Sequence, residues 1–212
     1  TGQAVMPDNW REGIKWIYAG WHEDHFMPNY DYQQSDMLLN GNVFNSGRVA
    51  MAYSHLWYTC CVGDVPNWDI AVVPSYEGTY TAKLHADTFR ILEYTEHPIE
   101  AFKVLDYLVA GPAMPELLQV YGAAPADEVY LQPFLDELDA RFPQGVNWDV
   151  AIASLAYPDN PNHESWLPNH TQSVVAIQNW SLNMQATPGL DVDAEIETLL
   201  QTLQGIFDAA QS

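Results

Sequence analysis

The apolar pattern changes near Pro98, and this change constrains the fold more than any other feature of the sequence. Before Pro98, short apolar runs rich in β-branched and aromatic residues predict buried strands at 48–53, 68–74 and 88–94. After Pro98, apolar residues recur at three- and four-residue steps, which is the helical period. This period predicts helices at 98–109, 115–121, 131–142, 148–157, 171–184 and 193–209. Mixed strands and helices followed by helices alone indicate an α/β protein.

The first part of the chain also carries helix signals. The helical period recurs at 10–21, and a short helix is expected at 35–39. Another helix is expected to follow the first predicted strand, and the polar stretch 159–168 is expected to be a loop. Polar residues that precede these apolar runs predict the N-caps. They are Asp8 or Asn9 for the first helix, Ser54 for the helix after the strand, and Asp191 or Asp193 for the last helix.

The charge balance excludes whole classes of partner. The 212 residues include 7 Lys and Arg against 28 Asp and Glu, a net charge of −21. Such a surface repels phosphate backbones and anionic lipid headgroups, so nucleic-acid and membrane-surface roles are excluded. The scarcity of cations also disfavours strongly anionic ligands such as sugar phosphates. With 48% hydrophobic and 17% charged residues, the chain has the composition of a folded protein.

The cysteines and histidines give no strong catalytic or metal motif. Cys60 and Cys61 are adjacent, so they cannot join distant segments, and we expect two small core residues. A vicinal disulfide or a reactive thiol remains the alternative. His22 and His25 could share a helix face, but no third ligand is spaced for zinc, so we expect a solvated helix end and no metal. The sequence also lacks G-x-S-x-G, P-loop and G-x-G-x-x-G motifs.

Several segments, in their order and spacing, resemble the sugar-binding solute receptors of bacterial ABC importers, the family that includes maltose-binding protein. The segment FNSGRVAM at 44–51 is similar to the family pattern F-x-x-G-K/R-x-A-M. The segments WDIAVVP at 68–74 and TEHPIEAFKVLDYL at 95–108 resemble two later family segments, and AAPA at 123–126 a third. These matches cover most of residues 10–130.

The resemblance implies a periplasmic-binding-protein-like architecture of the second type. In that family a ligand lies in a cleft between two α/β lobes. The chain would correspond to the C-terminal portion, with the first lobe largely missing. Residues 1–84 would form an α/β segment of the second lobe, residues 85–130 the hinge crossing with helices that pack on the first lobe, and residues 131–212 a helical return. Apolar faces that await the missing lobe would then need another partner, such as a second copy of the chain.

Two tryptophans are the predicted stacking residues. A sugar presents apolar C–H faces, which pack on flat aromatic rings. Trp57 lies where the resemblance implies a cleft-lining aromatic residue, and Trp166 lies in a polar connection from which the family often supplies another. The alternative for Trp166 is an anchored surface loop, and most other aromatic residues are expected to pack in the core.

Polar candidates flank the predicted elements. Tyr53, Ser54 and His55 come between a predicted strand and a predicted helix, where backbone and side-chain groups commonly bind ligands. His85 and Asp87 lie where the resemblance implies a ligand-binding segment, although the match there is poor. A carboxylate such as Asp87 could accept hydrogen bonds from two hydroxyl groups. The alternative for Asp87 is a hinge residue that caps a turn.

These features predict a non-catalytic solute-binding component of an ABC transport system, with a carbohydrate as the solute and no cofactor. Its implied partners are the permease membrane subunits and the missing N-terminal lobe. The resemblance implies an extracytoplasmic location, periplasmic or at the cell surface, with a lipid anchor on a segment outside this sequence. Because the chain starts at Thr1, we expect a mature product or a piece of a longer protein. A carbohydrate-active hydrolase or a lectin-like module is the alternative.

Overall fold

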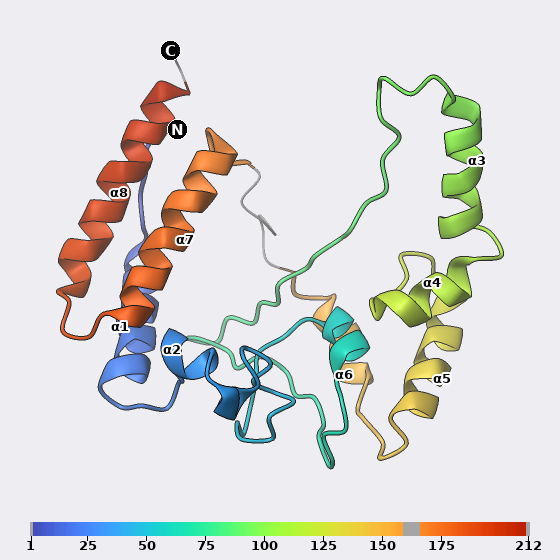
Figure 1. Cartoon of the computed structure of the whole chain (residues 1–212), viewed down its shortest axis with the longest axis horizontal. Helices are drawn as coiled ribbons and strands as arrows, with labels where there is room; N and C mark the ends of the chain where they lie inside the picture. Colours follow the sequence, from blue (N-terminus) through green and yellow to red (C-terminus); the bar gives the residue numbers. More distant parts are fainter. Residues whose placement is uncertain (1, 159–165, 211–212) are drawn as a thin grey trace. The chain divides into compact units, whose positions relative to one another are not determined.

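The protein is mostly helical. A computed structural model describes residues 2–158 and 166–210 (Figure 1). Helices account for 51% of the described residues. In the described ranges, β-structure is limited to two isolated bridges, Tyr76 with Thr79 and Ala82 with Pro158. The predicted α/β class, and with it the periplasmic-binding-protein-like second lobe, is therefore wrong.

The three predicted strands fail for a common physical reason. A strand is stable only where a neighbouring strand satisfies its backbone N–H and C=O groups. Segments 48–53, 68–74 and 88–94 have no such neighbour within the described residues and take no regular structure. Their apolar side chains divide accordingly: Trp68 and Ile70 pack against helices, whereas Leu92 and Tyr94 are exposed. Of the three segments, only 68–74 places apolar side chains against the core, as its composition predicts.

Backbone contacts divide the chain into two compact units. The first comprises Thr1–Val49 and His163–Ser212, and the second comprises Ala50–Asn162. These bounds differ from the divisions that the sequence predicts, which fall after residues 84 and 130. Part of the expected loop at 159–168, residues 159–165, lies outside the described residues. In the described parts of the chain, no helix is long and apolar enough to cross a membrane.

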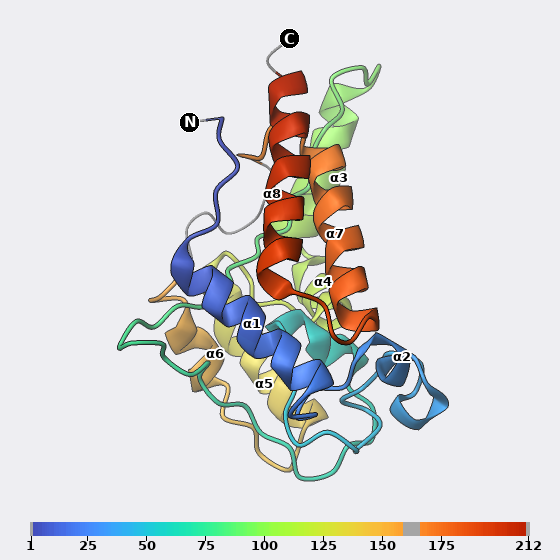
Figure 2. The ribbon, with the colours of Figure 1, turned by 90° about the vertical axis from the view of Figure 1, so that its left-hand side faces the viewer.

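The first unit is built on three long helices, α1 (Asp8–His22), α7 (His170–Ala186) and α8 (Val192–Ala209). A turn that contains Gly189 joins α7 to α8, which lie side by side, and α1 packs against both (Figure 2). Leu199, Leu203 and Phe207 of α8 form the buried core. The predicted helices at 10–21, 171–184 and 193–209 are confirmed. Two short elements, α2 (Tyr30–Gln33) and the 3-10 helix η1 (Asp36–Leu38), follow α1.

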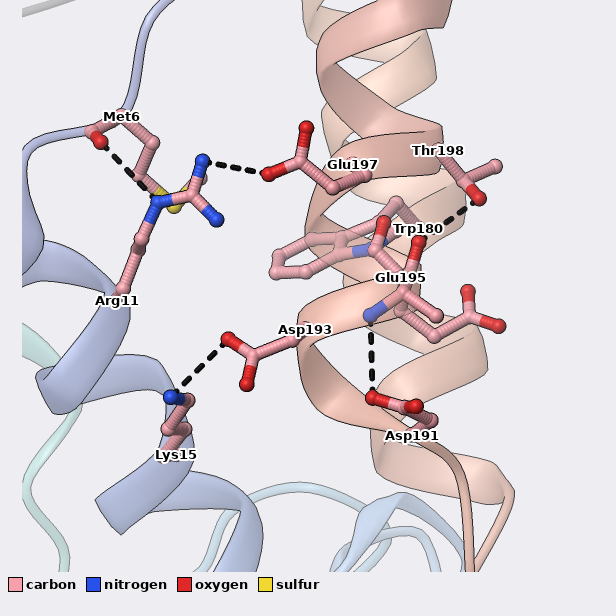
Figure 3. A network of polar contacts seen from close by, with 10 residues as sticks. Met6, Arg11, Lys15, Trp180, Asp191, Asp193, Glu195, Glu197 and Thr198 are labelled. Atoms are coloured by element: carbon pink, nitrogen blue, oxygen red, sulfur yellow. Dashed lines mark hydrogen bonds and ion pairs between the residues drawn. The ribbon is translucent and has the colours of Figure 1, made fainter.

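Buried and surface polar contacts fix α1 against the other two helices. The Tyr18 hydroxyl donates to the Thr187 carbonyl at 2.9 Å and accepts from the Leu190 amide at 2.8 Å, at the turn between α7 and α8. At the surface, Arg11 contacts Glu197 at 2.7 Å and Lys15 contacts Asp193 at 3.0 Å (Figure 3). Because exposed ion pairs contribute little, the Tyr18 bonds and the apolar contacts hold the helices together.

The structure confirms one of the predicted N-caps and contradicts two. Asp191 caps α8, because its carboxylate accepts from the Ala194 amide at 3.1 Å (Figure 3). Helix α1 begins at Asp8 after Pro7 and has no side-chain cap, so the prediction of Asp8 or Asn9 as its N-cap is wrong. Ser54 also caps nothing, since the 3-10 helix that follows it begins after His55.

The second unit is an assembly of short helices around one core. Its elements are η2 (Leu56–Cys61), α3 (Pro98–Val109), α4 (Met114–Tyr121), η3 (Glu128–Tyr130), α5 (Leu131–Arg141) and α6 (Asp149–Ser154). The sequence predicted helices at 98–109, 115–121, 131–142 and 148–157, and all four are confirmed, the last in a shorter form. Helices α4 and α5 supply most of the core, and the segment before α6 closes it with Phe142, Val146 and Trp148. Helix α3 has no buried residue.

The Trp68 ring and the Asp69 carboxylate connect segment 68–74 to this core. Trp68 packs edge-on against Phe142 and Trp148, with ring centroids 5.1 and 5.9 Å away. The adjacent Asp69 carboxylate accepts from the Asn147 amide at 2.7 Å and from the Ile70 amide at 2.8 Å. These two backbone donors lower the pKa of Asp69, because they stabilise its ionised form. The segment thus reaches the core through an aromatic ring and not through a sheet.

Candidate binding site around Trp57

The position of Trp57 is set by the contact between η2 and the end of α4. Leu56 faces the core of the second unit, and Thr59 is buried. The Thr59 hydroxyl donates to the Gly122 carbonyl at 3.1 Å. Gly122 ends α4 in the left-handed region at φ +74°, and a Cβ there would lie 2.8 Å from the Trp57 carbonyl oxygen. Only glycine permits this close approach, which places Trp57 beside the C-terminal turn of α4.

A pocket of about 430 Å³ opens at this junction. It is lined by Trp57, Cys60, His85, Asp87, Val120 and Tyr121. The Trp57 side chain is partly accessible, with 41% of the residue exposed. The pocket therefore combines an accessible indole ring with a carboxylate, an imidazole and a phenol, which are groups that can exchange hydrogen bonds with hydroxyls.

Rings of residues 53–57 form a cluster with the ring of His85 at this pocket. The His55 ring is stacked nearly parallel to Trp57, with 12° between the planes and 6.1 Å between centroids. The His85 ring lies 4.5 Å from His55, and the Tyr53 ring lies 6.2 Å away on an edge-on approach. The stacked His55 ring restricts the movement of the Trp57 ring.

The surroundings of His55 disfavour its charged form. Burial is the largest cause that lowers its pKa, and the positive charges of His85 and Lys83 add to the effect. Its Nε2 is buried and has no hydrogen-bond partner among the described residues. His55 therefore favours the neutral imidazole, which supplies packing to Trp57 without a charge.

Tyr121 and Asp87 form a polar pair on the pocket wall. The Asp87 carboxylate next to the Tyr121 hydroxyl is the main cause that raises the pKa of Tyr121, because it favours the neutral phenol. The phenol therefore stays protonated and is a hydrogen-bond donor on the pocket wall. Since a carboxylate accepts up to about four hydrogen bonds, Asp87 keeps acceptor capacity for a ligand.

The predicted site residues separate into two groups. Trp57, His85 and Asp87 line the pocket, and His55 and Tyr53 belong to the ring cluster that contacts two of these lining residues. Ser54 is exposed and does not line the pocket. Trp166 belongs to the other compact unit and is 61% exposed.

Three lining residues were missed as site residues. Val120 and Tyr121 lie at the end of α4. The sequence predicts this helix, but it does not indicate that η2 packs against its end. Cys60 was expected in the core together with Cys61, but Cys60 is half-buried and Cys61 is exposed, so that prediction is wrong. The glycine after Tyr121 was the available signal, because a helix that ends at glycine often permits a close backbone contact.

A second groove, of about 550 Å³, runs along α7 and α8 in the other unit. Its walls are mainly apolar and include Val175, Ala176 and Leu199. The indole N–H of Trp180, also on this wall, donates to the Glu195 carbonyl at 3.0 Å (Figure 3). Among the described residues, no ionisable side chain lines this groove, so it offers a ligand less directional chemistry than the pocket around Trp57.

The histidines of the segment 22–25 are used structurally. His22 contacts the Met184 carbonyl at 2.8 Å through Nε2, and His25 contacts the Trp21 carbonyl at 3.2 Å through Nδ1. Among the residues that the structure describes, no three His, Cys, Asp or Glu side chains are grouped to hold a metal ion.

Comparison with known proteins does not identify a family. No protein-family model matches the chain, and no curated protein shows significant similarity to it.

Proposed function

We propose that this chain binds a carbohydrate or a similarly polar solute at the pocket around Trp57, without catalysing its conversion. The observation that carries the proposal is the combination of an accessible indole ring with the Asp87 carboxylate in one small pocket. The apolar C–H face of a sugar ring packs on indole, while its hydroxyl groups donate to a carboxylate. His85 and Tyr121 supply further hydrogen-bonding groups on the same wall.

The wider role that we propose is that of a solute-binding component of an ABC import system, located outside the cytoplasm. This part of the proposal rests on the sequence segments at 44–51, 68–74 and 95–108, and not on the fold. The negative net charge of −21 supports an uncharged solute over an anionic one, because an anion would approach against the field of the whole chain.

A thermal-shift screen against neutral mono- and oligosaccharides tests the binding proposal. Binding to the folded state at a hundredfold excess over Kd adds about 2.7 kcal/mol to the free energy of unfolding, so one sugar should raise Tm in a dose-dependent way. Trp57→Ala should abolish this shift, because it removes the stacking surface. Trp166→Ala, an exposed tryptophan of the other unit, is the matched control and should leave the shift intact.

Two results would count against the proposal. A sugar shift that survives Trp57→Ala and is lost in Trp166→Ala would place the site in the other unit. The absence of any shift from a folded chain would remove sugars as ligands of this pocket. The same incubations, analysed for released sugar, separate binding from the hydrolase alternative, since a binding protein releases no product.

A further inference from the structure

We propose that Cys60 and Cys61 form a redox-modified site, a vicinal dithiol that closes to an intramolecular disulfide when a low-molecular-weight disulfide oxidises it. The two Sγ atoms lie 2.7 Å apart, in hydrogen-bond contact. Because the two residues are adjacent, the disulfide would close a ring of eight atoms through the peptide bond between them. This proposal does not depend on a ligand at the pocket around Trp57.

The fold holds the pair in place and leaves it accessible. Arg141 of α5 donates from Nη2 to the Cys60 carbonyl at 2.9 Å. On the N-terminal side, buried Thr59 is anchored to Gly122 at the end of α4. The exposed Cys61 can meet an oxidant from solvent, while the half-buried Cys60 lies on the pocket wall next to it. The geometry thus gives the two thiols different exposure at one site.

The two cysteines would take different parts in the reaction. The hydrogen bond with Cys61 raises the pKa of Cys60 first, and burial raises it further, so Cys60 favours the protonated thiol. The exposed Cys61 thiolate would attack the small disulfide, which forms a mixed disulfide and releases one thiol. Cys60 would then lose its proton to water and attack the Cys61 sulfur, which releases the second thiol. In total, the protein dithiol loses two electrons and two protons, and the small disulfide becomes two thiols.

Intramolecular closure is favoured over a link between chains by proximity. A nucleophile held next to its target reacts at an effective concentration far above that of a second molecule in solution. Labile disulfides in proteins are typically the exposed or strained ones, and Cys61 is exposed.

The test uses the whole reduced chain, incubated with mixtures of reduced and oxidised glutathione, quenched in acid and analysed by intact mass. Since the sequence contains only two cysteines, a monomer that has lost two hydrogens can contain only the Cys60–Cys61 bond. We expect this species to rise with the oxidised fraction of the buffer and to disappear on addition of dithiothreitol.

Two matched variants test the roles assigned to Cys61 as the attacking thiol and to Cys60 as the resolving thiol. Cys60→Ser should accumulate the glutathione adduct at Cys61, because the thiol that resolves it is gone, and Cys61→Ser should form its adduct several-fold more slowly. Circular dichroism establishes that each variant is folded before the assay. A wild-type chain that accumulates the adduct without closure, or that forms covalent dimers, would overturn the proposal. Equal adduct rates in the two variants would overturn the order of attack.

Discussion

His55 shows how the surroundings of one residue set its charge and thereby its function. The imidazole lies between Trp57 and His85, and its Nε2 has no partner in the described parts of the chain. Burial disfavours the imidazolium most strongly, and the neighbouring cations disfavour it further. A neutral His55 keeps the stack on Trp57 intact over the neutral pH range.

The pKa of His55 gives a pH prediction with a definite sign. In the unfolded chain His55 titrates near its ordinary value of about 6.5, and in the folded chain below it. The unfolded state therefore binds the proton more readily, and the free energy of unfolding falls as pH drops from 6.5 through the folded pKa. Above pH 6.5 the contribution is fully present.

An NMR titration of the histidine ring protons measures this directly. We expect the His55 midpoint to lie below its ordinary value in the wild type and to move upward in His85→Gln, which removes one repelling charge but not the burial. His97→Gln, a histidine that has no place in the ring cluster around His55, is the control and should leave the midpoint unchanged. A His55 midpoint above its ordinary value would contradict the assignment.

At the scale of elements, the junction of η2 and α4 carries the site. Helix α4 ends at Gly122, and η2 runs close beneath that end, so two elements far apart in sequence share one backbone contact. Trp57 and Cys60 come from one side of the junction, and Val120 and Tyr121 from the other. The pocket exists because these two short elements meet.

Gly122→Ala tests the junction against a matched glycine. Gly145 also has a positive φ, +82°, but nothing lies within 4 Å of the position of its Cβ. We expect Gly145→Ala to cost about 1 kcal/mol of unfolding free energy from backbone strain alone. Gly122→Ala should cost about 1–3 kcal/mol more, because the new methyl group overlaps the Trp57 carbonyl and the Thr59 hydroxyl.

Urea unfolding of both glycine variants, followed by tryptophan fluorescence, measures the two losses. An equal loss of unfolding free energy in the two variants would contradict the close backbone contact between η2 and the end of α4. We also expect Gly122→Ala to weaken any ligand at the pocket around Trp57, since it displaces the backbone that carries the ring.

At the scale of the whole molecule, the described residues form two separate cores, one in each compact unit. Phe134, 3% exposed, belongs to the core of the second unit, and Ile196, fully buried, lies in the first. The two hydrophobic clusters share no residue. Separate cores of this kind allow the two units to lose structure separately.

Large-to-small substitutions in each core test this division. Phe134→Ala should cost about 3–5 kcal/mol and Ile196→Ala about 2–5 kcal/mol, because each leaves a cavity. Hydrogen exchange should show lost amide protection in α4 and α5 for Phe134→Ala, with α7 and α8 retained, and the reverse for Ile196→Ala. Loss of protection in both units from either variant would show that they unfold as one.

The sequence alone determined where most helices form. The helical spacing of apolar residues placed seven of them, and Asp191 or Asp193 was indicated as the cap of α8, because helix signals are local and need only nearby residues. The sequence also indicated Trp57, His85 and Asp87 as residues of one site, and all three line the pocket around Trp57.

Only the tertiary structure decided whether the predicted strands form and where the pocket lies, because both depend on residues distant in sequence. Whether 68–74 is a strand depends on a second strand, and in the described residues Trp68 instead found Phe142 and Trp148. The contact that brings Thr59 to Gly122, and so Tyr121 to Trp57, spans 63 residues, and no local pattern encodes it. Local periodicity determined the helices. Long-range packing decided that the described residues form no sheet, where the pocket lies and that Cys61 is exposed.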